Sequence, residues 1–208
     1  MDGEMEPFGK SMARAGIGKE GPEFVKRINT KLIERDFIKH LWTQLPPASN
    51  QALMSHPEVS RLIFLYRSNL FDVAVSTFLA KSLGHWNRVD PEEIVRPITI
   101  TPPQIKRFCG ELKADVLDQA KRVRASGKPV HLIRYEDLYS VAYRDRFLEV
   151  CNFLKLDGGN EAAIERLRPS EKYSGDETLA RAIANWRSLE PLRAAPRLTV
   201  TLEGLDHT

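Results

Sequence analysis

Short apolar runs that alternate with long segments of helical periodicity are the feature that most constrains this chain. Residues 61–66, RLIFLY, form one such run, and residues 130–135, VHLIRY, form a second. A continuous apolar run of this length is typical of a strand that is covered on both faces. The apolar positions between Leu70 and His85 predict a helix after the first run. This alternation predicts the α/β class, with a central parallel sheet and helices on its faces.

The strongest helix signal begins at Thr101-Pro102-Pro103-Gln104. Threonine can cap a helix, proline suits the first helical position, and Gln104 completes a capping box. Apolar residues then recur at steps of three and four, which predicts one long apolar face that ends near Gly127. The residues of this face are Ile105, Phe108, Leu112, Val116, Ala120 and Val123.

Two further helices and two loops complete the expected organisation. The helices carry apolar residues around 147–154 and around 179–186, and the loops fall at 45–50 and at about 87–103, where prolines gather. Neither loop is long enough to separate two domains.

The composition predicts one soluble domain. The chain has 208 residues, of which 42% are hydrophobic, and domains usually run about 100–200 residues. We expect a single domain over residues 1–190 and a C-terminal tail over residues 191–208. A net charge of +3 does not indicate a general nucleic-acid binder. We find no secretory signal and no run of about 18 apolar residues, so we expect a cytoplasmic protein without a membrane span.

The cysteines and histidines do not indicate a metal site. Cys109 and Cys151 fall beside apolar helical positions, and we expect two buried thiols in a reducing compartment, although a disulfide remains open. The five histidines are scattered, and no cysteine or histidine pair has metal-ligand spacing.

Arg67 and Ser76 are the first candidate site residues. Arg67 directly follows the first strand, and Ser76 lies on the next helix. Ligands of parallel α/β sheets bind beyond the carboxyl ends of the strands. A guanidinium, a hydroxyl and backbone N–H groups near a helix start predict an anion site, because the planar fork of arginine binds two phosphate oxygens. The alternative is a surface arginine and a helix serine that share no ligand.

The segment around these two residues resembles a known family. Residues 61–86, RLIFLYRSNLFDVAVSTFLAKSLGHW, resemble the 3′-phosphate-binding segment of sulfotransferases that use 3′-phosphoadenosine 5′-phosphosulfate (PAPS). The resemblance implies that Arg67 and Ser76 hold the 3′-phosphate of the donor. It also implies a three-layer α/β/α fold, of the P-loop nucleotide-binding type, around the parallel sheet.

The bacterial branch that includes trehalose sulfotransferase is the most similar one. Ala80, Gly84 and Trp86 resemble that branch. A second basic residue often follows the arginine there, whereas Ser68 takes this place here and is expected to weaken the site. The branch is dimeric, so a homodimer is implied by the resemblance alone.

Two later segments resemble the same family. Residues 130–138, VHLIRYEDL, resemble a late strand followed by a Tyr-Glu-Asp-Leu turn, and residues 147–156, FLEVCNFLKL, resemble the helix that comes next. From the residues alone, we favour a structural role for Glu136 and Asp137, such as capping this region.

The C-terminal third supplies two weaker candidates. The basic loop at residues 166–173 resembles a late loop that closes over the 3′-phosphate, which makes Arg168 and Lys172 candidate donor ligands. The helix with Asn185 and Trp186 resembles the closing helix of the family, although plain core packing is the preferred interpretation.

The candidate general base is Glu23. Residues 13–24, ARAGIGKEGPEF, resemble the segment of the trehalose-type branch in which a glutamate before an aromatic residue is the base on the acceptor hydroxyl. Glu23 matches that glutamate, and Glu20 is the second choice. A hydroxyl is a poor nucleophile until a base takes its proton as the sulfuryl group transfers. The alternative for Glu23 is a solvated charge in a glycine-rich loop.

The 5′-phosphosulfate loop of the family, of the type Arg-Ser-Gly-Ser-Thr after a first strand, is not evident. On this alignment the loop falls on residues 1–6, MDGEME, where acids replace hydroxyl and basic residues. Residues 9–11, Gly-Lys-Ser, lack the upstream glycines of a phosphate loop, and we interpret them as chance. We therefore expect an N-terminally incomplete fold, from either a truncated sulfotransferase or a degenerate relative.

Three hypotheses for function result. The first is a sulfotransferase that moves a sulfuryl group from PAPS to a hydroxyl of a carbohydrate or glycolipid acceptor, without a metal. The second is a protein that keeps the 3′-phosphate site and binds the nucleotide without catalysis. The third is a nucleotide kinase or another phosphate-loop relative. It would need an intact glycine-rich loop followed by Lys-Ser or Lys-Thr after a strand, and this sequence lacks one.

Overall fold

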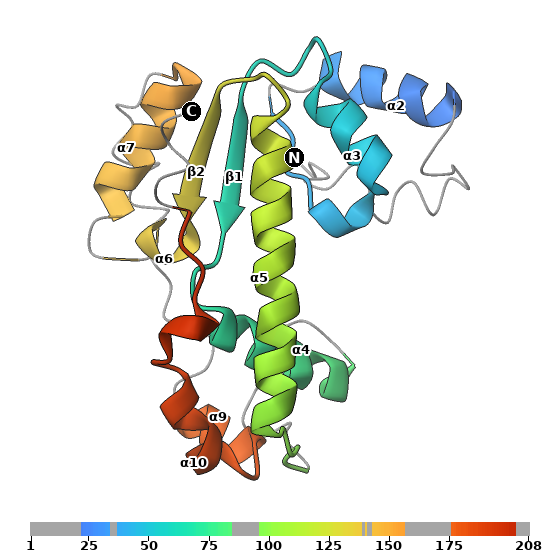
Figure 1. The fold of residues 1–208 in the computed structure, drawn as a ribbon. Helices are drawn as coiled ribbons and strands as arrows, with labels where there is room; N and C mark the ends of the chain where they lie inside the picture. Colours follow the sequence, from blue (N-terminus) through green and yellow to red (C-terminus); the bar gives the residue numbers. More distant parts are fainter. Residues whose placement is uncertain are drawn as a thin grey trace. The chain divides into compact units, whose positions relative to one another are not determined.

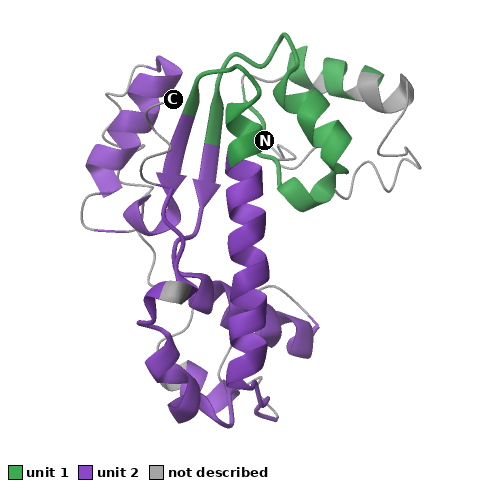
Figure 2. Cartoon of the chain, in the orientation of Figure 1, with its two compact units in different colours: residues 1–63, 121–130 green, residues 64–120, 131–208 purple. Residues whose placement is uncertain are grey.

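A computed structural model describes the chain at residues 22–33, 37–84, 96–138, 140, 143–156 and 176–202. These residues form a mixed α/β structure with a small two-stranded parallel sheet flanked by helices (Figure 1). Contacts divide the chain into two compact units, residues 1–63 with 121–130 and residues 64–120 with 131–208 (Figure 2). Each unit has its own hydrophobic cluster and is described by itself. The expectation of one domain over residues 1–190 stays a prediction.

The two expected strands are present and pair in parallel. They are β1 (Leu62–Tyr66) and β2 (Val130–Arg134). The side chains of β1 alternate, because successive residues of a strand point to opposite faces. Phe64 and Tyr66 pack against the core of the second unit, whereas Ile63 and Leu65 are 39% and 50% exposed. The prediction that β1 is covered on both faces is therefore wrong for these two side chains.

The helix α5 (Pro102–Arg124) confirms the strongest helix prediction. Its capping box forms as expected: Thr101 N–H donates to Gln104 Oε1 at 2.7 Å, and Gln104 N–H donates to Thr101 Oγ1 at 3.4 Å. The six positions of the predicted apolar face are all buried or half-buried, and Ile105 is fully enclosed. Local sequence therefore determines both the start and the packing face of this helix.

The helix α4 (Leu70–Leu83) contributes six buried residues to the second unit. Asn69 caps it, because its Oδ1 accepts from Asp72 N–H at 3.2 Å. It ends at Gly84, whose φ of 75° lies in the left-handed region that favours glycine. The helix buries five residues that face the core, namely Leu70, Phe71, Ala74, Val75 and Leu79.

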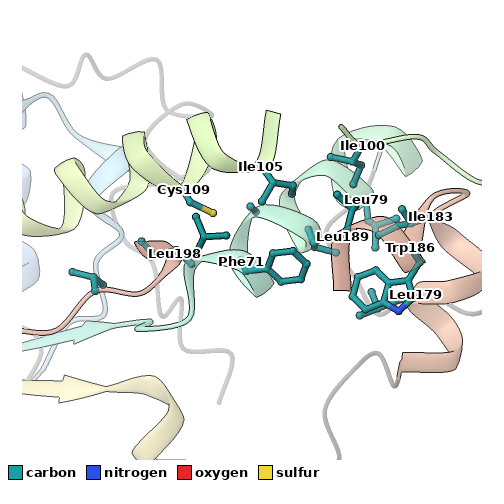
Figure 3. Packing of buried hydrophobic residues seen from close by; sticks show 14 of the residues in the cluster. Phe71, Leu79, Ile100, Ile105, Cys109, Leu179, Ile183, Trp186, Leu189 and Leu198 are labelled. Carbon is teal, nitrogen blue, oxygen red and sulfur yellow. The ribbon is translucent and has the colours of Figure 1, made fainter. Parts of the chain in front are cut away.

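The core of the second unit joins α4 to α5 and to the C-terminal residues. Figure 3 shows Phe71 of α4 near Ile105 of α5 and near Trp186, which comes from the C-terminal part of the chain. The ring centroids of Phe71 and Trp186 are 6.0 Å apart. Aromatic pairs at this separation add to the stabilisation that burial of their area supplies.

The helix expected around residues 179–186 is divided in two. The structure has α9 (Asp176–Ala182) and α10 (Trp186–Leu189) with a break between them. In the break, the Asn185 amide donates to Ile100 C=O at 2.7 Å and accepts from Ile100 N–H at 3.1 Å. In the same break, Ile98 N–H donates to Ala182 C=O at 2.9 Å and Ala184 N–H donates to Ile98 C=O at 2.8 Å, so the backbone here pairs with residue 98 instead of continuing the helix. Core packing, the preferred role for this segment, is confirmed by the burial of Trp186.

Residues 191–202, which we expected to belong to a C-terminal tail, pack closely. The short 3₁₀ helices η3 (Glu190–Leu192) and η4 (Pro196–Leu198) follow α10. Beyond them, Val200 and Leu202 are each only 1% exposed. The chain therefore contributes to the core up to Leu202, and residues 203–208 lie outside the described residues.

The second unit also contains α6 (Tyr135–Leu138), directly after β2, and α7 (Tyr143–Leu154). The helix α7 confirms the helix expected around residues 147–154. It packs on β2 through Phe153, whose ring centroid lies 5.2 Å from that of His131.

The first unit contains α2 (Pro22–Ile33), η1 (Trp42–Gln44) and α3 (Pro47–Met54). The helix α3 corrects the loop that was predicted at residues 45–50. Pro47 takes the first position of α3, where a missing N–H group costs nothing, so this proline starts a helix instead of excluding one. The small core of the unit is formed by Ile28, Leu45 and Leu53.

Asn50 is the buried polar residue that joins η1 to α3, with 1% of its surface exposed. Its Nδ2 donates to the carbonyls of Trp42 at 2.9 Å and Leu45 at 3.0 Å. Its Oδ1 lies 2.6 Å from Nε2 of His40. All three bonds hold the chain between residues 40 and 50 in one conformation.

We expect Asn50→Ala to lower the free energy of unfolding by about 2–4 kcal/mol, because several buried bonds are lost at once. Urea denaturation measures this change. Asn152→Ala, on the exposed side of α7, is the matched control and is expected to change stability by less than about 0.5 kcal/mol. Equal stability of the two variants would contradict the role of Asn50.

A buried position in α4 and an exposed position in β1 should differ in how much a substitution lowers stability. Phe71→Ala should cost about 3–5 kcal/mol of unfolding free energy, because it empties a fully enclosed site in the core. Leu65→Thr should cost less than about 0.5 kcal/mol, because threonine suits an exposed strand position. Thermal or urea unfolding of both variants checks the pair. A large loss for Leu65→Thr would show that this face of β1 is covered in solution.

Both cysteines are buried free thiols, as expected, and burial raises the pKa of Cys109 from 9.0 to about 11. The folded state disfavours the thiolate, so stability is full below about pH 9 and falls as the pH rises towards 11.

In Cys151→Ala, iodoacetamide at about pH 8 should modify Cys109 only after denaturation, since the thiolate is the nucleophile. Mass spectrometry detects the adduct. Modification of the folded variant at the rate of the denatured one would refute this.

Candidate functional site

The candidate site lies at the edge of the sheet where both strands end. β1 ends at Tyr66 and β2 ends at Arg134, and parallel pairing places these ends at the same edge (Figure 1). Arg67 and Tyr135 are the first residues beyond the strands. Both belong to the second unit. This edge is where ligands of parallel α/β sheets bind.

Arg67 rests on an aromatic ring. Its guanidinium carbon lies 4.1 Å from the centroid of the Tyr135 ring, and the side chain is exposed. The negative face of the ring attracts the cation. A cation–π contact engages the face of the guanidinium, whereas hydrogen bonds to phosphate are made in its plane. The contact with Tyr135 is therefore compatible with anion binding by the same guanidinium.

Glu136 binds the backbone of the turn that follows Arg67. Ser68 N–H donates to Glu136 Oε2 and Asn69 N–H donates to Glu136 Oε1, each at 3.1 Å. The sequence analysis expected backbone N–H groups near the start of this helix to bind an anion, and these two directly precede α4. An internal carboxylate now satisfies them, which stabilises the start of α4 as an anion at a helix N-terminus does. Glu136 thus has a structural role, as we favoured, but it binds the turn after β1 and not its own segment.

Ser76 lies on the second turn of α4, at an exposed position. Its hydroxyl donates to the Asp72 carbonyl, one turn earlier, at 2.7 Å. This bond to the preceding turn is common for serine in helices. To donate to a phosphate oxygen, the hydroxyl has to rotate away from that carbonyl. Arg67 and Ser76 therefore stand on one strand–turn–helix connection, with no shared hydrogen-bond partner among the described contacts.

Arg193 is a basic residue near this connection that the sequence analysis missed. Its Nε donates to Asp72 Oδ1 at 3.0 Å, and both side chains are about two-thirds buried, with 33% and 28% exposure. The pair neutralises the carboxylate of Asp72, which lies on the same face of α4 as Ser76 because the two are four residues apart. A negative charge that would repel an anion near Ser76 is thereby compensated.

Asp137, the second acid of the turn, also has a structural partner. Arg134 donates to Asp137 Oδ1 through Nε at 3.0 Å and through Nη2 at 2.6 Å. The hydrogen bond that Arg134 donates to Asp137 raises the pKa of Arg134 above its usual value. Arg134 at the end of β2 is thus held by the turn that follows it.

Of the other sequence-predicted residues, the structure describes only the backbone of Glu23. Glu23 falls in the first turn of α2 and in the first unit, so its backbone is helical and is not part of a glycine-rich loop. Its side chain lies outside the described part of the structure. Arg168, Lys172 and residues 1–6 also lie outside the described residues. Among the candidates, the structure therefore positions only Arg67 and Ser76.

Comparisons with known proteins add no relative. A scan against protein-family models, a search of curated proteins and a search of solved structures each returned no match. Within the described residues, no helix is long and apolar enough to cross a membrane. No group of three or more histidine, cysteine, aspartate or glutamate side chains is arranged to hold a metal ion in that same part of the chain.

Proposed function

We propose that this protein is a sulfotransferase that moves a sulfuryl group from PAPS to a hydroxyl of a carbohydrate or glycolipid acceptor. One observation carries the proposal. Arg67 directly follows β1, which ends at Tyr66, the helix α4 begins at Leu70, and Ser76 is exposed on its second turn. The segment thus has the strand–arginine–helix–serine order of the donor-binding segment that its sequence resembles. The proposal also implies the fold of that family, a three-layer α/β/α arrangement around a parallel sheet larger than the two strands described.

In this proposal, several side chains bind the donor together. The guanidinium of Arg67 and the hydroxyl of Ser76 bind the 3′-phosphate, with Arg168 and Lys172 closing over it. Glu23 takes the proton of the acceptor hydroxyl. The acceptor oxygen forms the new bond to sulfur while the bond from sulfur to the 5′-phosphate oxygen breaks. The products are the sulfate ester and 3′-phosphoadenosine 5′-phosphate.

A second candidate is nucleotide binding without transfer. Residues 1–6 lack the hydroxyl and basic residues that would stabilise charge on the transferring group. The N–H groups of Ser68 and Asn69, which directly precede α4, are in addition occupied by Glu136. The first observation favours loss of the chemical step, and the second favours binding of the 3′-phosphate through side chains.

Isothermal titration calorimetry with two nucleotides tests the 3′-phosphate site. We expect 3′-phosphoadenosine 5′-phosphate to bind the wild type in the micromolar range, and Arg67→Ala to weaken it by about ten- to a hundredfold, the loss of one charge-assisted contact. Ser76→Ala should weaken it less, because the hydroxyl carries no charge. Adenosine 5′-monophosphate lacks the 3′-phosphate, so its affinity should be equal in all three proteins.

The control is Arg107→Ala, which removes an exposed arginine of α5 that pairs with Glu111. Its affinity for both nucleotides should equal that of the wild type. If a folded wild type does not bind 3′-phosphoadenosine 5′-phosphate, the proposal is wrong. Binding with no transfer of labelled sulfate from PAPS to mono- or disaccharide acceptors would favour the second candidate.

A further inference from the structure

The ends of the two strands continue their pairing through side chains. Arg67 and Ser68 follow β1, and Tyr135 and Glu136 follow β2 in the same order. The first residues of the two turns meet as cation and ring, at 4.1 Å. Glu136, the second residue of α6, accepts from two backbone N–H groups of the turn that follows β1. Tyr135 and Glu136, at the start of α6, thus hold three consecutive residues of that turn, namely Arg67, Ser68 and Asn69.

The two contacts on the β1 turn have different consequences. The carboxylate of Glu136 fixes the orientation of the peptide groups of Ser68 and Asn69. The Arg67 backbone leads directly into these peptide groups, so the carboxylate also limits the direction in which its Cα–Cβ bond points. The Tyr135 ring then supports the far end of that side chain. Glu136 acts on the base of the arginine, and Tyr135 acts on its tip.

We propose that Glu136 is a positioning residue for Arg67: it holds the Ser68–Asn69 turn so that the guanidinium stays on Tyr135 and faces the donor phosphate. The binding part of this inference rests on the proposed function. Positioning matters because an exposed arginine loses substantial rotamer freedom when it binds, and a held side chain loses less. Glu136 itself does not touch the ligand in this proposal.

Only a glutamate side chain meets the geometry. Its two oxygens accept from two successive N–H groups, each at 3.1 Å. Glutamine has the same shape but replaces one oxygen with an N–H₂ group, which places a donor against a donor. Aspartate keeps the charge but is shorter by one methylene, so it reaches at most one of the N–H groups well. Glu136→Gln preserves the shape and Glu136→Asp preserves the charge, and both remove the two-point clamp.

The competing explanation predicts the opposite sign. If Glu136 occupied N–H groups that the ligand phosphate needs, its carboxylate would compete with the ligand, and Glu136→Gln would strengthen binding. If Glu136 positions Arg67, the same variant weakens binding. The direction of the change therefore separates a positioning residue from a competing internal anion.

The first experiment is a double-mutant cycle on the binding of 3′-phosphoadenosine 5′-phosphate, measured by calorimetry. Glu136→Gln should raise Kd by about tenfold, which corresponds to one charge-assisted contact. In the Arg67→Ala background, the same substitution should change Kd by less than about twofold, because its effect passes through the arginine. A merely structural role would lower affinity equally in both backgrounds. Glu149→Gln, an exposed glutamate on α7, is the control and should bind as the wild type does.

The second experiment needs no nucleotide. The guanidinium carbon of Arg67 lies 4.1 Å from the centroid of the Tyr135 ring, and Nε is bonded to this carbon, so we expect the ring current to shift the Nε–Hε resonance upfield. Arg67→Lys identifies the resonance in a ¹⁵N–¹H spectrum, and Glu136→Gln should move it towards the value of an unrestrained arginine. Tyr135→Leu should move it in the same direction. Dispersed spectra and an unchanged melting temperature show that each variant is folded, and Glu136→Asp replaces Glu136→Gln if the latter is not.

The outcomes separate the two proposals. An upfield resonance that Glu136→Gln abolishes, together with weaker binding that depends on Arg67, supports the positioning role. An unchanged resonance, unchanged binding or tighter binding in Glu136→Gln overturns it. If the wild type binds no nucleotide, the proposed function fails, and the resonance alone decides whether Glu136 positions Arg67.

Discussion

The turn at Ser68 and Asn69 connects β1 to α4, and two distant parts of the chain, at Glu136 and Val200, hydrogen-bond to it. Its two N–H groups donate to Glu136, the Ser68 carbonyl accepts from Val200 N–H at 3.0 Å, and Asn69 caps α4 through Asp72. Backbone polar groups in a partly buried turn need partners, and these partners come from far along the sequence. Their convergence fixes the direction in which α4 leaves β1. The burial of the apolar face of α4 depends on that direction.

The elements that local sequence predicted well are those whose signals lie within one turn or one strand. The capping box of Thr101 and Gln104 and the three-to-four spacing after it determine α5 without reference to any other part of the chain. The continuous apolar run 61–66 likewise identifies β1. It does not determine what covers the strand, because Ile63 and Leu65 are as apolar as their neighbours and yet stay exposed. Hydrophobicity predicts a strand, whereas coverage depends on the rest of the fold.

The features that sequence reasoning missed are contacts between residues far apart in the chain. Arg193 reaches Asp72 across 121 residues, and Asn185 reaches Ile100 across 85 residues. Neither has a periodic or motif signal, because a single side chain bonded to a distant backbone leaves no pattern in the sequence. The backbone around Ile183 likewise pairs with Ile98, at a place where the apolar neighbours indicate a continuous helix. For the candidate site, sequence identified Arg67 and its turn but not the Tyr135 ring that supports the guanidinium.

The N–H groups that would attract a phosphate to this edge of the sheet can also bind a carboxylate of the protein itself. N–H groups at the start of a helix favour an anion, and Glu136 supplies one. A ligand phosphate would then be recognised by side chains that lie outside the clamp, with Arg67 using its plane while its face rests on Tyr135. In a phosphate loop, several backbone N–H groups share the negative charge. Here Arg67 would balance most of the negative charge of the phosphate, so phosphate binding would depend on the orientation of its guanidinium.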